Sequence, residues 1–238
     1  MTLSTVPVIF DLDGTLVDPA GGISDGIASA LGELGIPVPS QELLDAMIGP
    51  KLSDSLLNVA MVPAGQLDEA IRIYRQYYLA TGIAQGRLYP GIRGLLENFV
   101  AAGRPIAVAT QKPEGLARTV LEHHGIAGLF QFIRGSAADE SAAADGPVGK
   151  TGIIAAALSD LGTQHAIMVG DRAQDVAGAI ANGLDCIGVS WGFATDGELQ
   201  EAGAVTVVDN TAALLQTVEH LESIHSAAMS EVQNDGTV

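Results

Sequence analysis

The sequence predicts an α/β protein, with a doubly wound parallel sheet as its core and an all-helical unit inserted after the first strand. Short β-branched apolar runs alternate along the chain with amphipathic stretches, and this alternation is typical of doubly wound folds. The runs are continuously apolar, as parallel strands are when helices cover both faces of their sheet. Residues 19–86 break the alternation, because they carry helix signals and no convincing strand.

Six apolar runs predict the strands of the sheet, and they cover residues 6–10, 105–110, 131–134, 166–170, 184–189 and 205–208. Amphipathic stretches predict the helices of the core over residues 92–102, 114–124, 150–161, 173–182 and 211–222. The last residues, 223–238, are small and polar, and we expect them to fray.

The insertion has its own helix signals, over residues 23–34, 52–60 and 66–80. Ser40 is the expected N-cap of a further helix that begins at Gln41. The return to the sheet is rich in glycine, as suits a linker or hinge. We therefore predict a catalytic core of residues 1–17 and 88–238 and a helical cap domain of residues 18–87.

The chain of 238 residues carries 28 acidic and 11 basic residues, which gives a formal net charge of −17. Such a surface repels nucleic acid and anionic membranes, so neither is an expected partner. It repels a phosphorylated substrate as well. A site for such a substrate must therefore supply local positive charge from a metal ion or from a few placed Lys and Arg side chains.

One cysteine, Cys186, excludes a disulfide within the chain and fits a reducing cytoplasm. The first residues lack the basic start and long apolar stretch of a signal peptide, and no window reaches the roughly 18 apolar residues of a membrane span. We expect a cytoplasmic protein, either a monomer or a homodimer.

Two carboxylates, Asp11 and Asp13, directly follow the first predicted strand. Residues i and i+2 of an extended segment point the same way, so both acids face one site. That site lies at the carboxyl end of a strand, where open α/β sheets bind ligands. Gly14 and Thr15 then form a tight turn whose backbone N–H groups can meet an anionic substrate.

Three further predicted strand or helix ends carry matching groups. Thr110 ends the second strand of the core, and its hydroxyl can bind a phosphate oxygen. Lys150 opens a helix, where an ammonium group and the helix N-terminus together attract an anion. Asp171 ends a fourth strand and can bind a hard cation beside Asp11, whereas Asp175, one helical turn later, can bind that cation through water or orient the site.

In order and at strand ends, the motifs DLDGT (residues 11–15), Thr110, Lys150 and GDRAQD (residues 170–175) resemble those of the haloacid dehalogenase-like (HAD) hydrolase superfamily. The helical insertion resembles that family's cap. The segments RLYPGIRG and ATQKPEG resemble its phosphoglycolate phosphatase and 5′-nucleotidase-like branch. The resemblance implies a Rossmann-like core and a Mg²⁺-dependent phosphomonoester hydrolase for a small phosphorylated metabolite, either phosphoglycolate or a nucleoside 5′-monophosphate.

The resemblance also implies a role for each residue. Asp11 is the nucleophile, and Asp13 protonates the leaving oxygen and then activates water. Mg²⁺ is bound by Asp11, the backbone carbonyl of Asp13, Asp171 and waters, with Asp175 nearby. Thr110 and Lys150 balance charge on the transferring phosphoryl group.

Two departures from the family pattern bear on the substrate. Arg172 stands where many relatives carry Ser or Thr, and Gln111, a candidate substrate contact, stands where Asn is common. In the loop of residues 48–52, Lys51 is a second candidate, for a further anionic group of the substrate or for its phosphate.

Three other functions remain open at this point. A phosphomutase shares all four motifs and differs in passing the phosphoryl group to a sugar. A haloacid dehalogenase needs no acid two residues after the nucleophile, so Asp13 argues against it. A non-catalytic binding module is expected to lose one of the motif positions, and none is lost here.

Overall fold

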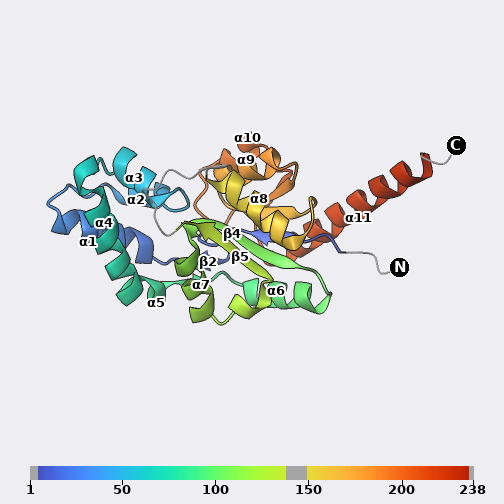
Figure 1. The fold of residues 1–238 in the computed structure, drawn as a ribbon, viewed down its shortest axis with the longest axis horizontal. Coiled ribbons are helices and arrows are strands. Elements are labelled where there is room, and N and C mark those ends of the chain that lie inside the picture. Colours follow the sequence, from blue (N-terminus) through green and yellow to red (C-terminus); the bar gives the residue numbers. More distant parts are fainter. Residues whose placement is uncertain (1–4, 138–148, 236–238) are drawn as a thin grey trace.

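The computed structural model describes residues 5–137 and 149–235 and confirms the predicted fold class (Figure 1). A six-stranded sheet, parallel throughout, has the order β5-β4-β1-β6-β7-β8. Its strands are β1 (Val8–Phe10), β4 (Ile106–Pro113), β5 (Phe132–Ser136), β6 (Ile167–Gly170), β7 (Asp185–Val189) and β8 (Thr206–Val208), and each overlaps one of the predicted runs. Since β1 lies between β4 and β6, the carboxyl ends of these three strands meet at the middle of one sheet edge.

Helices cover both faces of the sheet. One face carries α6 (Ile92–Ala101), α7 (Glu114–His123), η3 (Ala127–Leu129) and α11 (Thr211–Asp235), and the other carries α8 (Lys150–Leu161), α9 (Ala173–Ala181) and α10 (Glu198–Ala202). Strand β1 shows residue by residue how both faces of the sheet are buried. Val8 and Phe10 join the hydrophobic cluster of the first face, whereas Ile9 between them joins that of the second. Both sides of the strand are therefore buried, which explains its continuous apolar sequence.

Between β2 (Val17–Asp18) and β3 (Arg87–Leu88), which pair antiparallel, the chain is helical. This stretch contains α1 (Gly22–Glu33), α2 (Gln41–Ala46), α3 (Leu52–Asn58), η1 (Ala64–Gln66), α4 (Leu67–Tyr77), the π-helical turn η2 (Tyr78–Gly82) and α5 (Ile83–Gln85). We call these the cap helices, and they lie together at one end of the molecule (Figure 1). The division into domains at residues 18 and 87 stays a prediction.

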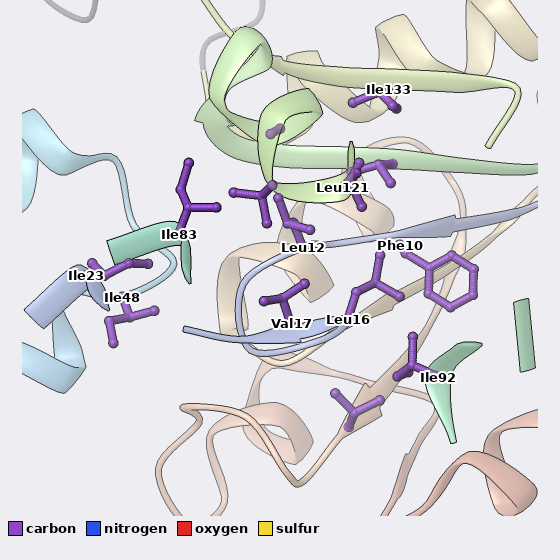
Figure 2. Close-up of a cluster of buried hydrophobic side chains, with 14 of the residues drawn as sticks. Phe10, Leu12, Leu16, Val17, Ile23, Ile48, Ile83, Ile92, Leu121 and Ile133 are labelled. Carbon is purple, nitrogen blue, oxygen red and sulfur yellow. The ribbon is translucent and has the colours of Figure 1, made fainter. Parts of the chain in front are cut away.

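One hydrophobic cluster runs without interruption from the sheet into the cap helices (Figure 2). Phe10 and Ile92 belong to its core part, and Ile23, Ile48 and Ile83 to its cap part. Figure 2 shows Leu12 and Leu16, on the loop after β1, and Val17, at the start of β2, among these side chains. The loop that carries the first motif is thus fixed from both sides.

Several local features differ from the sequence predictions. Ser40 precedes α2 as expected, but its side chain makes no capping hydrogen bond. The π-helical turn η2, the short pair β2–β3 and α10 were not foreseen. Helix α11 continues to Asp235, so residues 223–235 are helical where the sequence predicts fraying. Residues 236–238 lie outside the described part of the chain.

Within residues 5–137 and 149–235, no helix has the length and apolar character needed to cross a membrane.

An ion pair between the buried Arg104 and the partly buried Glu222 ties α11 to the segment before β1. Arg104 donates from Nη2 to Oε2 of Glu222 at 2.8 Å and from Nη1 to the carbonyl of Val6 at 2.7 Å. Oε1 of Glu222 accepts the N–H of Val6 at 2.8 Å. The carboxylate of Glu222 and the guanidinium of Arg104 therefore bind each other, and each also hydrogen-bonds the backbone of Val6, just before β1.

We expect Arg104→Met to lower the free energy of unfolding by about 1–3 kcal/mol, because the partly buried carboxylate of Glu222 would lose its cation. Chemical denaturation measures this change. The matched control is Arg72→Met, which removes an exposed pair with Glu69 and should change stability little. Equal losses in the two variants would contradict the structural role of Arg104.

Candidate active site

Six polar residues singled out in the sequence meet at the carboxyl ends of β1, β4 and β6 and at the start of α8. All six are buried: Asp11, Asp13, Thr110, Lys150, Asp171 and Asp175. Burying so many polar groups is unfavourable unless they bind one another or a ligand. This concentration marks the sheet edge as the candidate active site.

Asp11 and Asp13 follow the central strand and share one cavity. The N–H of Asp11 donates to the carbonyl of Val169 on β6 at 2.9 Å, so the strand pairing continues through this residue. Both acids line a cavity of about 50 Å³, together with Thr110. The Oδ1 atom of Asp13 is buried without a hydrogen-bond partner in the protein. One carboxyl oxygen therefore remains available to a bound molecule.

Lys150 is the first residue of α8 and lies between two of the carboxylates. Its ammonium nitrogen is 2.5 Å from Oδ1 of Asp11 and 2.7 Å from Oδ1 of Asp175. Burial lowers the pKa of Lys150, but the two carboxylates raise it by more, so it lies above its usual value and the side chain stays cationic. A cation opposed to the helix dipole is thus held in place by its partners.

Asp171 and Asp175 are fixed by donors around them. Asp171 accepts the Thr15 hydroxyl on Oδ1 at 3.0 Å and the N–H of Phe193 on Oδ2 at 2.8 Å. Oδ2 of Asp175 accepts two backbone N–H groups at the start of α9, from Asp171 at 3.1 Å and Arg172 at 3.0 Å. Asp175 therefore orients two groups, the backbone at the end of β6 and the ammonium group of Lys150.

A second basic residue, Lys112, which the sequence analysis missed, completes the charged cluster. Its ammonium nitrogen lies 2.9 Å from Oδ2 of Asp13, and the Lys112 side chain is 6% exposed. Lys112 follows Thr110 by two residues on β4. The register of β4 against β5 shifts between Ala109 and Pro113, and such irregularities re-aim side chains. As a result Thr110, Gln111 and Lys112 all line the cavity, which a regular strand would not allow.

The site holds an excess of negative charge. Burial raises the pKa of Asp13 despite Lys112 beside it. Burial also raises the pKa of Asp171, with further contributions from the charges of Asp175 and Asp11, and it raises the pKa of Asp175 to about 6 although Lys150 opposes the shift. Four carboxylates face two ammonium groups here, so the cluster has a net charge of −2 when all these groups are ionised.

A divalent cation would compensate the excess negative charge of the site. Carboxylate oxygens of Asp11, Asp171 and Asp175 lie within 4.8 Å of one another. Mg²⁺ prefers oxygen ligands of this kind and usually keeps several waters. Two added positive charges would balance the net charge of −2 that the two lysines leave on the four carboxylates. The donor set therefore agrees with the predicted cofactor.

Gly14 and Thr15 support a carboxylate rather than face the cavity, which differs from the prediction. Their N–H groups donate to the carbonyls of Val17 at 2.8 Å and Leu12 at 3.3 Å and so do not meet an anion. The Thr15 hydroxyl holds Asp171 instead. Gly14 has a φ of 86°, and a Cβ there would lie 2.1 Å from Oδ2 of Asp171.

The loop between α2 and α3 is held against the core by two of the residues that depart from the family pattern. Gln111 lines the cavity, but its Nε2 donates to the carbonyl of Gly49 at 3.1 Å. Arg172 donates from Nη1 to the carbonyl of Ile48 at 2.6 Å. Lys51 lies on this loop yet is not among the residues that line the cavity.

Similarity to known proteins agrees with this geometry. The family described as haloacid dehalogenase-like hydrolase matches residues 8–189. A 5′-nucleotidase from Pseudomonas aeruginosa is 36% identical over 214 residues, which are 89% of this chain and 95% of that protein. Tyrosine-protein kinase PtkA from Mycobacterium tuberculosis is 39% identical over 228 residues, which are 95% of this chain and 70% of that protein. Among solved structures, a predicted phosphatase from Clostridium acetobutylicum has a TM-score of 0.83 at 34% identity and covers 91% of this chain and 100% of its own.

We expect Gly14→Ala to lower the free energy of unfolding by about 2 kcal/mol or more and to abolish activity, because the methyl group must displace Asp171 and the backbone must hold a left-handed conformation. Gly94→Ala is the control, since it lies in α6 with open space around it and should stabilise the helix by about 0.5–1 kcal/mol. Thermal unfolding and a phosphatase assay of both variants test this, and a neutral Gly14→Ala would contradict the steric account.

Proposed function

The chain belongs to the haloacid dehalogenase-like hydrolase family and is a phosphatase, and we propose that it is a Mg²⁺-dependent phosphomonoester hydrolase that transfers the phosphoryl group first to Asp11 and then to water. The observation that carries this proposal is the shared cavity of Asp11, Asp13 and Thr110, with Lys150 bound to an oxygen of Asp11. A nucleophile, an acid and charge-balancing groups are all present where a phosphate ester can reach them.

In the first step an oxygen of Asp11 attacks phosphorus, and the bond from phosphorus to the leaving oxygen breaks. Asp13 gives its proton to that oxygen. In the second step the ionised Asp13 takes a proton from water, whose oxygen attacks phosphorus, releases inorganic phosphate and restores Asp11. The raised pKa of Asp13, which follows from its burial, suits a carboxyl group that must begin as an acid.

Asp11, Asp171 and the backbone carbonyl of Asp13 would hold the Mg²⁺, and Asp175 would act from beside it. When bound, the cation supplies positive charge for the non-bridging phosphoryl oxygens. Lys150 adds its ammonium from the start of α8, and the Thr110 hydroxyl donates a hydrogen bond. These groups offset the repulsion that the net charge of −17 exerts on an anionic substrate.

The cap side of the cavity bears on the leaving group. The cap helices and the loop between α2 and α3 line the cavity with side chains that are apolar or aromatic, namely Ile23, Met47, Ile48, Pro50, Leu52 and Tyr74. Among the described residues of this wall none is basic, so a carboxylate such as that of phosphoglycolate would find no cation there. The wall therefore favours a leaving group with apolar or aromatic surface, and of the two substrates implied by the family resemblance we propose a nucleoside 5′-monophosphate.

The cavity is small beside the roughly 300–1,000 Å³ of typical ligand pockets. A substrate of this class therefore requires the cap helices to move away from the core for entry and product release.

Asp11→Asn should lower kcat for p-nitrophenyl phosphate by at least about 1,000-fold, because the amide is a poor nucleophile of nearly the same shape. The control Asp68→Asn changes an exposed residue at the start of α4 and should retain activity. Turnover by Asp11→Asn close to that of the unchanged protein would contradict the nucleophile assignment.

The acceptor is tested with the unchanged protein and the same substrate. If water is the acceptor, inorganic phosphate and p-nitrophenolate should appear in equal amounts. An excess of p-nitrophenolate that grows when a sugar or sugar phosphate is added would instead support the phosphomutase alternative.

A further inference from the structure

The ammonium group of Lys112 lies where the core meets the cap helices, and none of the roles described so far accounts for it. On the core side it is paired with Oδ2 of Asp13 at 2.9 Å, and their side chains are 6% and 9% exposed. On the cap side it lies over the ring of Tyr78, 4.4 Å from the ring centroid. A buried cation held between a carboxylate and an aromatic face makes a strong, directional contact.

The tyrosine is itself set in place by the cap helices. Tyr78 begins the π-helical turn η2 and stacks on Tyr74 of α4, with ring centroids 5.6 Å apart and planes 13° apart. A Cβ at Gly82 would lie 2.6 Å from the Tyr78 ring, and one at Gly26 of α1 would lie 3.1 Å from the Tyr74 ring. Small residues therefore make the space in which both rings are held.

The pairing with Lys112 also determines which oxygen of Asp13 is free. Since Oδ2 accepts from the ammonium group, Oδ1 is the oxygen without a protein partner. Without this anchor the carboxyl group could rotate about its terminal bond, whose torsional preference is broad. On the cap side, the Tyr78 ring covers the ammonium group that forms this anchor.

We propose that Lys112 is a positioning residue that orients the carboxyl group of Asp13 toward the leaving oxygen, and that its contact with Tyr78 makes this orientation depend on the cap helices lying against the core. The inference rests on the proposed role of Asp13 as the acid. It assigns to Lys112 an effect on proton transfer, distinct from the general attraction of a cation for phosphate.

The test compares two leaving groups. p-Nitrophenolate is a stable anion and departs without a proton, whereas the alkoxide that leaves from n-propyl phosphate needs one. The value of kcat/KM reports the steps up to and including cleavage of the bond to the leaving group. We expect Lys112→Met to lower the ratio of kcat/KM for n-propyl phosphate to that for p-nitrophenyl phosphate by about 30- to 100-fold. Lys112→Arg, which keeps the charge, should restore part of the ratio.

An equal loss for both substrates in Lys112→Met would overturn the proposal, because it would show that the ammonium group only attracts phosphate. An unchanged ratio in a folded variant would overturn it as well. Thermal unfolding of each variant confirms that it is folded.

A second pair of variants tests the link to the cap helices and does not alter Lys112. Tyr78→Leu removes the ring and should lower the same ratio by about tenfold, whereas Tyr78→Phe keeps the ring face and should lower it less. Equal effects of the two changes would contradict the role of the ring. If the unchanged protein hydrolyses neither substrate, the proposed function fails, and this proposal fails with it.

Discussion

Four carboxylates lie buried together at the carboxyl ends of β1 and β6, and their mutual repulsion is the constraint on which the surrounding structure depends. The chain makes room for them with glycine. At Gly14, Gly170 and Gly192 a Cβ atom would lie 2.1–2.3 Å from a carboxylate oxygen of Asp171 or Asp175. Hydrogen bonds from the backbone, from Thr15 and from two lysines then stabilise the cluster, yet they do not neutralise it.

The same constraint gives two identical side chains different tasks. Asp11 lies beside Lys150 at the start of α8, and the ammonium group of Lys150 contacts one of its carboxylate oxygens. Asp13, two residues later, is buried between Lys112 and the cap side of the cavity, and its pKa is raised by burial. Separate surroundings for neighbouring carboxyl groups are the usual way in which one site supplies both a nucleophile and an acid. The cap helices belong to this arrangement, because Tyr78 completes the surroundings of Lys112.

The part of this picture that could be predicted from the sequence follows from regular structure. Alternating apolar runs locate the six strands, and parallel strands place Asp11, Thr110 and Asp171 at one edge of the sheet because their carboxyl ends all meet there. Lys150 could be placed because a basic residue at a helix start conflicts with the helix dipole.

The rest depended on irregular or long-range geometry. Lys112 lies in the same short segment as Thr110, but only the register shift of β4 turns it into the cavity. Its contact with Tyr78 depends on how the cap helices fold back over the core, which no local pattern encodes. A tight turn has backbone N–H groups that can meet an anion, but at Gly14 and Thr15 the hydrogen bonds of the turn itself use those donors.

The central claim is that the buried acidic cluster requires a divalent cation, and calorimetric titration of Mg²⁺ into the chelator-treated protein tests it most directly. The account predicts one Mg²⁺ per chain, with binding weakened at least tenfold by Asp171→Asn, and a thermal unfolding midpoint that rises with Mg²⁺ concentration. No heat of binding at millimolar Mg²⁺, together with an unfolding midpoint that does not respond to the cation, would contradict it.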